Sequence, residues 1–339
     1  MTAERTADPM VNRRAFITGM TGGLLAAPLA AAAQHARSDT SPVHVGILGY
    51  GTGVLPHLRN AFRAKLADFG YVSGQNLVID ERYADGRRDR VPGFAAELIA
   101  LYARVFVVVG PYVLKIAKSV VRTTPLVAID LESDPVAAGF AKSLARPGGN
   151  VTGTFFDQAD IAGKWLQLLR EVNPRLSRVT VVQDSSTPPY QLEALKASAR
   201  SIPVELHTLV IATHDDFKGA FERASRSRAG AVVLLSSPLV SSYGDLLAHL
   251  STATHLPTVS MFRENVTAGC VMAYGPSLAD GWGHVGSFVG RILNGAKAAD
   301  LPIERPTTFD LVINLKTAKA LGLPIPPSLL QRADQVIDP

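Results

Sequence analysis

Cysteine is almost absent from this chain of 339 residues, since Cys270 is the single one. One thiol cannot form a disulfide within the chain, so a disulfide-stapled fold is excluded. Cys270 stands in the apolar run Gly-Cys-Val-Met-Ala-Tyr, a setting typical of a thiol buried in a strand. We therefore expect it to be structural.

The motifs of metal and nucleotide chemistry are also missing. The eight histidines stand apart, with no H-x-H or H-E-x-x-H pair, and there is no P-loop and no G-x-S-x-G sequence. Beside His214, Asp215 is placed to cap a helix over 217–227 and is not expected to bind a metal. No cofactor is expected.

Clusters of positive charge are lacking as well. The net charge is +5, and the basic residues are scattered singly, without aromatic residues between them, which argues against a nucleic-acid partner. With 47% hydrophobic and 19% charged residues, the chain has the composition of a globular protein.

The first 34 residues are predicted to be an export signal. Arg13 and Arg14 precede an apolar stretch, and three alanines supply small residues for cleavage near Ala33. The alternative is a membrane anchor, but residues 17–33 include three Gly, one Pro and two Thr, and a span needs about 20 strongly apolar residues. The arginine pair favours the twin-arginine route over the general one. We expect a periplasmic location.

Beyond the leader, short runs of Val, Ile and Leu alternate with amphipathic stretches, which predicts βαβ units and parallel sheets in an α/β protein. Strands are expected at 43–48, 77–83, 105–109, 125–129, 179–182, 204–210, 231–235, 257–261 and 309–313. Helices are expected at 56–69, 159–172 and 277–294.

The segment 124–156 is predicted to join two similar lobes. A short helix should start at Asp134-Pro135 and stop at Arg146-Pro147. The helix over 277–294 should fold back on the first lobe and the strand over 309–313 should join the second, so that the chain crosses a hinge three times. This assigns 43–154 plus 275–305 to lobe 1, and 155–274 plus 306–335 to lobe 2.

Ligands of parallel sheets lie at the carboxyl ends of the strands, so we expect a small molecule to bind there between the lobes. The candidate contacts at those ends are Tyr50, Gly51, Thr52, Pro111, Tyr112, Asp130, Glu132, Phe155, Asp184, Ser185, Ser237, Pro238, Phe262, Arg263 and Tyr274. Phe155 and Phe156 should face opposite ways, so one of the two is expected to contribute. A hard-metal cluster of Asp130, Glu132 and Asp134 is the less favoured alternative.

Two ligand classes stay open. An amino acid would place its ammonium on Glu132 or Asp184, and its carboxylate on Ser185, Ser237, backbone N–H groups or Arg263. An aromatic or other apolar carboxylate would need the second set alone.

Four segments resemble the periplasmic solute-binding proteins of ABC transporters, in the family with tryptophan- and tyrosine-binding members. They are FGYVSGQNLVIDERYADG (69–86), DPVAAGFAKSLARPGGNVTG (134–153), MAYGPSLAD (272–280) and FDLVINLKTAKALGLPIPPSLLQRAD (309–334). The resemblance implies a type I binding-protein fold, capture of a solute without catalysis, and delivery to an ABC permease in the inner membrane. We expect a monomer.

The loop Gly49-Tyr50-Gly51-Thr52-Gly53 is richer in glycine than this family leads us to expect. It also resembles a dinucleotide-binding turn, so an exported NAD(P)-dependent oxidoreductase is the alternative function. The G-x-G-x-x-G fingerprint is incomplete, because Val54 stands at the third glycine position.

Overall fold

The computed structural model describes residues 41–156 and 159–338. The predicted leader and its cleavage site lie outside the described residues. Residues 42–339 form one compact unit, which contains two sheets. No helix in the described ranges has the length and apolar character to cross a membrane.

The first sheet is wholly parallel and has the order β2-β1-β3-β4-β5. Its strands are β1 (Val43–Gly49), β2 (Leu77–Tyr83), β3 (Val105–Val109), β4 (Leu126–Asp130) and β5 (Val151–Phe155). Its helices are α2 (Pro56–Asp68), α3 (Val91–Ala100), α4 (Pro111–Val120) and α11 (Leu278–Leu293), with short 3₁₀ turns at Arg88–Arg90 and Ala298–Asp300.

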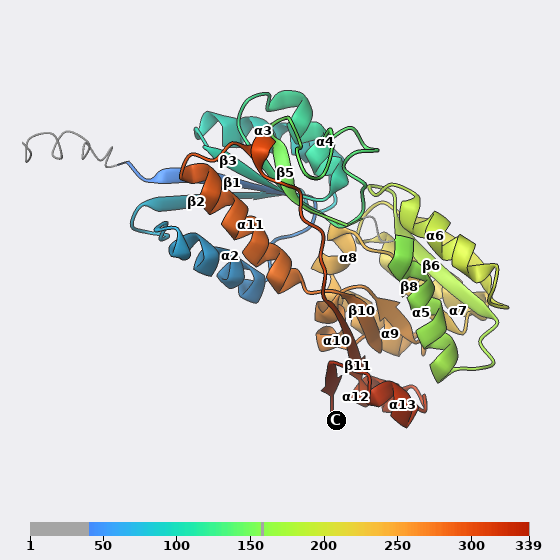
Figure 1. Ribbon diagram of the computed structural model, residues 1–339. Coiled ribbons are helices and arrows are strands. Elements are labelled where there is room, and N and C mark those ends of the chain that lie inside the picture. Colours follow the sequence, from blue (N-terminus) through green and yellow to red (C-terminus); the bar gives the residue numbers. More distant parts are fainter. Residues whose placement is uncertain (1–40, 157–158, 339) are drawn as a thin grey trace, which may run out of the picture. The chain divides into compact units, whose positions relative to one another are not determined.

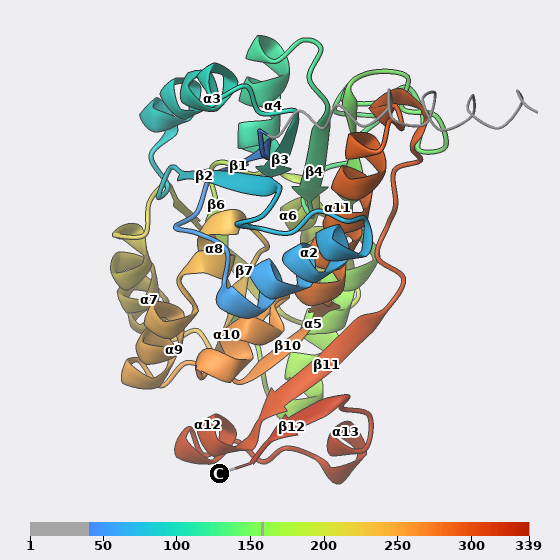
Figure 2. The ribbon, with the colours of Figure 1, turned by 90° about the vertical axis from the view of Figure 1, so that its left-hand side faces the viewer.

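Helices α2 and α11 lie side by side on one face of this sheet, and α3 and α4 lie on the other (Figures 1 and 2). Two glycines of α11 allow the close approach to α2. A Cβ on Gly286 would stand 2.7 Å from the Phe62 carbonyl oxygen, and one on Gly290 would stand 2.4 Å from the Phe69 ring. The small residues therefore set the packing distance of this helix pair.

The second sheet has the order β12-β11-β10-β9-β8-β6-β7, and β10 and β11 run antiparallel. Its strands are β6 (Arg178–Asp184), β7 (Glu205–Ile211), β8 (Ala231–Leu234), β9 (Thr258–Ser260), β10 (Met272–Pro276), β11 (Phe309–Asn314) and β12 (Gln335–Ile337). Its helices are α5 (Ala159–Val172), α6 (Tyr190–Ala199), α7 (Asp216–Arg226), α8 (Pro238–Ser242), α9 (Gly244–Ala253), α10 (Arg263–Ala268), α12 (Leu315–Ala320) and α13 (Pro327–Leu330).

The chain passes between the sheets three times: after β5, after β10 and before β11. The last passage runs beside the first, because Glu304 N donates to the Gly153 carbonyl and Phe155 N donates to the Glu304 carbonyl, each over 3.0 Å. These passages bring the carboxyl ends of strands from both sheets to one region of the molecule.

Two local predictions are wrong. No helix forms over 134–146, where the chain makes turns. Asp134 Oδ1 does accept from the N–H groups of Val136 and Ala137, but Gly139 then adopts a φ of 71° and ends the turn. Phe140 is buried against Phe155, with ring centroids 6.3 Å apart, so tertiary packing overrides the helix signal here.

Asp215 stands at the N-cap of α7 as expected, but the expected capping hydrogen bond is absent. Its backbone is already helical, with φ −63° and ψ −25°, and its side chain makes no capping bond. The neighbouring Asp216 Oδ2 instead accepts from the N–H groups of Ala212 and Thr213, at 2.8 and 3.0 Å. These two hydrogen bonds stabilise the loop before α7.

Candidate functional site

A cavity of about 60 Å³ lies where the carboxyl ends of β1, β3 and β4 face α8 and Phe262 from the second sheet. Its walls are mostly apolar, with a few polar groups, which is the usual composition of small-molecule sites. Its volume is below the roughly 300 Å³ or more of such sites, so a ligand of that size requires the walls to move apart. The lining residues are Gly49, Gly51, Gly53, Val54, Leu55, Leu58, Tyr83, Val109, Ile129, Leu131, Glu132, Pro238, Ser241, Ser242, Phe262, Leu278 and Trp282.

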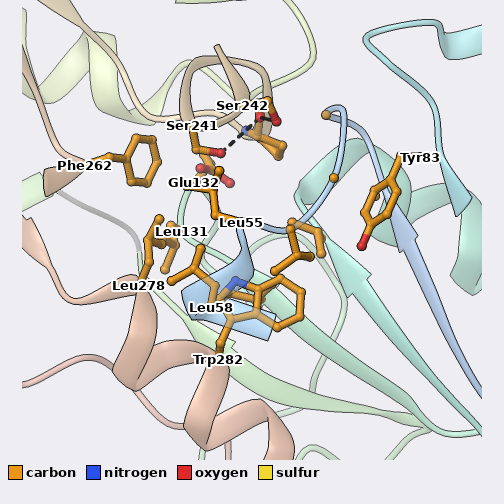
Figure 3. A pocket seen from close by; sticks show the side chains of 17 residues that line it. Leu55, Leu58, Tyr83, Leu131, Glu132, Ser241, Ser242, Phe262, Leu278 and Trp282 are labelled. Carbon is orange, nitrogen blue, oxygen red and sulfur yellow. Dashed lines mark hydrogen bonds between the residues drawn. The ribbon is translucent and has the colours of Figure 1, made fainter. Parts of the chain in front are cut away.

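The largest apolar side chain in the cavity wall is that of Trp282, in the first turns of α11. Its ring meets Phe62 of α2 edge to face, with centroids 5.9 Å apart and an interplanar angle of 82°. In Figure 3 it lies beside Leu58 and below Glu132, with Phe262 on the far side of the cavity. Because Phe62 is fully buried, the indole is held in place by the core.

The glycine-rich loop after β1 lies against the second sheet's α8. A Cβ on Gly51 would stand 2.0 Å from Ser242 Oγ and 2.7 Å from the Pro238 carbonyl oxygen. The next residue, Thr52, donates its N–H to Ser242 Oγ over 3.2 Å. Gly51 therefore permits close contact between elements of the two sheets. This contact explains a glycine at position 51 without a bound dinucleotide.

Two buried carboxyl groups, Asp130 and Glu132, follow β4. Asp130 Oδ1 accepts from the Glu132 N–H over 3.0 Å, and Glu132 Oε1 accepts from the Ser236 hydroxyl over 2.6 Å. Burial raises the pKa of Asp130 to about 6. Burial also raises the pKa of Glu132 well above its usual range, and the neighbouring Asp130 charge raises it further.

A third buried carboxyl group, Asp184, comes from the end of β6. Its Oδ1 accepts from the Ser186 N–H over 2.7 Å, and burial raises its pKa. Within the described part of the chain, Asp130 Oδ2 and Asp184 Oδ2 are both buried without a hydrogen-bond partner. The Asp184 charge also raises the pKa of Glu132, so the carboxyl groups of the two sheets act on each other.

Tyr50 and Tyr112 form a second aromatic group near Asp184. Their rings meet edge to face at 5.7 Å, and the Tyr50 hydroxyl donates to the Gly86 carbonyl over 2.7 Å. The Arg88 guanidinium lies 5.1 Å from the centre of the Tyr112 ring and donates to Ser185 Oγ over 3.1 Å. Neither tyrosine lines the cavity.

Of the candidate contacts predicted from the sequence, four line the cavity: Gly51, Glu132, Pro238 and Phe262. Thr52 and Ser237 adjoin two of these residues in the chain, and Asp130 stands two positions before Glu132. None of the three lines the cavity. Ser237 is the N-cap of α8, where its Oγ accepts from the Val240 N–H over 3.0 Å. Pro111 is buried at the start of α4.

Three candidates have other partners. Phe155 is buried against Phe140 in the core of the first sheet, and Tyr274 stacks on Phe309 at 6.1 Å. Arg263 lies 3.3 Å from Asp310 Oδ2 and also donates to Gln335. Phe156, the alternative to Phe155, likewise packs on Phe309, so neither phenylalanine lines the cavity.

Sequence reasoning missed the residues that form most of the apolar wall, including Leu55, Leu58, Tyr83, Leu278 and Trp282. Four of them stand at or near the start of a helix, whereas the prediction used only the polar residues at the ends of strands. The expected return of 277–294 to the first lobe was the available signal for Trp282.

Among the described side chains, no group of three or more His, Cys, Asp or Glu is placed to hold a metal ion.

Comparisons with known proteins agree with this architecture. A family model described as ABC transporter substrate binding protein matches residues 54–337. The tyrosine-binding protein of Clostridioides difficile is 24% identical over 274 residues, which cover 79% of this chain and 77% of that protein.

Two solved structures superpose over most of the chain. The ABC domain from Streptococcus pneumonia in complex with L-Trp has a TM-score of 0.78 and 24% identity, and the match covers 88% of this chain and 100% of that one. A conserved domain protein from Vibrio cholerae has a TM-score of 0.77 and 24% identity, with 87% and 100% covered. At these identities the likeness shows the fold, and the predicted two-lobed α/β architecture is confirmed.

Proposed function

The chain belongs to the family of ABC transporter substrate binding proteins, and we propose on this premise that it captures a small amino-acid-like solute and delivers it to a membrane permease. The observation that carries the proposal is the cavity itself. Its wall combines an apolar surface around Trp282 and Phe262 with one buried carboxyl group, Glu132, and it draws on both sheets. No group in this site needs to react with the solute.

Closure of the two lobes is the proposed means of capture. Hydrogen bonds from Thr52 N to Ser242 and from Ser236 to Glu132 join the sheets beside the cavity. A solute that contacts both walls favours the closed arrangement through its differential affinity for it. The three passages between the sheets would act as the hinge, with lobe 1 at 43–154 plus 275–305 and lobe 2 at 155–274 plus 306–335.

The contacts that we propose for the solute are Glu132, Phe262, Pro238 and Gly51, together with Trp282, Leu58 and Tyr83. The relatives with known ligands support an amino-acid-like molecule, since one is named a tyrosine-binding protein and another was solved with L-Trp. Export to the periplasm, cleavage near Ala33 and action as a monomer complete the proposal. The arginine pair at Arg13-Arg14 supports the twin-arginine route.

A thermal-shift screen followed by calorimetry tests the proposal. A ligand that binds only the folded chain stabilises it by about 2.7 kcal/mol at a concentration 100 times its Kd. The compounds are amino acids, aromatic acids, amines and nucleosides. A folded sample that responds to none of these classes would contradict solute capture.

A pair of glycine variants tests whether closure is needed. Gly51→Ala places a methyl group against Ser242 and Pro238, so we expect at least tenfold weaker binding of any ligand found. Gly93→Ala is the control, because a Cβ at Gly93 meets nothing within 4 Å. Equal affinity in the two variants would show that close contact at Gly51 is not required.

A further inference from the structure

The charges around the cavity are of one sign. Among the described lining residues there is no Lys, Arg or His, and the ionisable side chains are Glu132 and Tyr83. Tyr83 donates its hydroxyl to Glu81 over 2.7 Å, away from Glu132. Glu132 is therefore the group that meets a charged ligand.

Two further carboxyl groups strengthen this negative character. Asp130 and Asp184 are both fully buried, and each keeps one carboxylate oxygen without a hydrogen-bond partner within the described ranges. Both charges act on Glu132. Buried carboxylates with unused acceptor oxygens are complementary to a ligand that brings hydrogen-bond donors and positive charge.

The basic side chains near the cavity have other partners. Arg88 contacts the Tyr112 ring and Ser185, and its charge acts on Asp184 and not on Glu132. Arg263 contacts Asp310 and Gln335. His57 lies 3.1 Å from Glu264. A ligand carboxylate in the cavity would therefore face Glu132 without a cationic partner.

The hydroxyl donors beside the cavity are also engaged, which leaves the Trp282 indole N–H as the neutral side-chain donor on the wall. The hydroxyl groups of Ser241 and Ser242 both donate to the Pro238 carbonyl, at 3.0 and 2.7 Å. The Ser236 hydroxyl donates to Glu132, and the Thr52 N–H donates to Ser242. A carboxylate that used the engaged donors would have to break these bonds. It would also lie near three acidic groups with at most the indole N–H as a partner, and burying its charge there is unfavourable.

We propose that the cavity recognises an organic amine, whose ammonium group binds Glu132 with support from Asp130, and that it does not require a carboxylate on the ligand. This inference rests on the proposed capture of a small solute. The apolar remainder of the ligand lies against Trp282, Phe262 and Leu58, which suits an aromatic or branched aliphatic group. The site therefore distinguishes ligands by their charged group, because a ligand carboxylate would have no cationic partner there.

Calorimetry at pH 7.5 with matched compounds tests the inference. The probes are tryptamine against indole-3-propionate, tyramine against 3-(4-hydroxyphenyl)propionate, phenethylamine and 3-methylbutylamine, together with L-Trp and L-Tyr. We expect at least one amine to bind 30-fold or more tightly than its matched acid, and no less tightly than the matched amino acid.

The outcomes separate this inference from the function it rests on. If no amine binds 30-fold more tightly than its matched acid, or if every matched amino acid binds more tightly than its amine, the inference is overturned and solute capture stands. The inference is also overturned, and solute capture stands, if no amine binds while a compound of another class does. If nothing binds to the folded protein in the wider screen, solute capture itself is overturned.

Two glutamate variants locate the effect. Glu132→Gln should weaken amine binding at least 30-fold, because the amide carries no charge. Glu264→Gln is the matched control: Glu264 is also buried and also accepts one side-chain hydrogen bond, but it does not line the cavity. Urea melts of both variants confirm folding, and Asp130→Asn provides a second variant with an expected loss of about fivefold or more. Unchanged amine affinity in folded Glu132→Gln would overturn the proposal.

Discussion

Replacing Asp130 by Asn should stabilise the ligand-free protein at neutral pH. Burial raises the pKa of Asp130 from 3.8 to about 6 in the folded state, so the folded chain holds this proton more tightly than the unfolded chain. The resulting stability is fully present below about pH 4 and is lost as the pH rises through about 6. Asn cannot ionise, so the variant avoids that loss.

The size of the effect follows from the pKa shift. One pKa unit corresponds to about 1.4 kcal/mol, so a shift of roughly two units costs the native protein about 3 kcal/mol of unfolding free energy above pH 6. The variant keeps an oxygen that can accept from the Glu132 N–H, as Asp130 Oδ1 does. We therefore expect a gain of about 2 to 3 kcal/mol at pH 7.5, shrinking towards zero at pH 4.

Urea denaturation at pH 4, 5, 6 and 7.5 measures this difference. Asp216→Asn is the control of opposite sign, because hydrogen bonds from the Ala212 and Thr213 N–H groups lower the pKa of Asp216. That substitution should destabilise the protein by nearly the same amount at all four pH values, because the lowered pKa of Asp216 lies below 3.8 and the loss begins only there. If Asp130→Asn changes stability by the same amount at every pH, the reasoning about the buried charge is wrong.

Three other predictions follow from the contacts. Burial raises the pKa of Cys270 to about 12, so a thiol reagent at pH 8 should label it in urea but not in the native protein, and fast native labelling would contradict this. Gly286→Ala should lower the unfolding free energy by about 1 to 3 kcal/mol, because the methyl group meets the Phe62 carbonyl, whereas Gly93→Ala should not. Amine binding should release a proton from Glu132, because burial raises the pKa of this carboxyl group. The buffer takes up that proton, so the calorimetric enthalpy of binding should differ between phosphate and Tris. Equal enthalpies in the two buffers would argue against proton release.

The regular elements were predictable because their signals are local. The expected strands at 77–83 and 105–109 and the helix at 159–172 have the bounds that the structure shows. The strand at 105–109 is a continuous apolar run, and the helix carries its own periodicity. The helix expected after Asp134 failed because Phe140 packs on Phe155, a tertiary contact that no local pattern reports.

The candidate site was predictable only in part. The rule that ligands lie at strand ends predicts the edge of both sheets at which the cavity lies, and Glu132, Gly51, Pro238 and Phe262 are among the residues that line it. It could not tell which polar side chains are already paired. Arg263 is held by Asp310, 47 positions later in the chain, and such long-range ion pairs are not visible in sequence spacing.

The most direct test of the account is a crystal structure of the full chain grown with the amine that binds most tightly. We predict density for the ligand between Trp282 and Phe262, with its nitrogen within hydrogen-bond distance of the Glu132 carboxyl group. A ligand bound elsewhere, or one oriented with its nitrogen away from Glu132, would contradict the central claim.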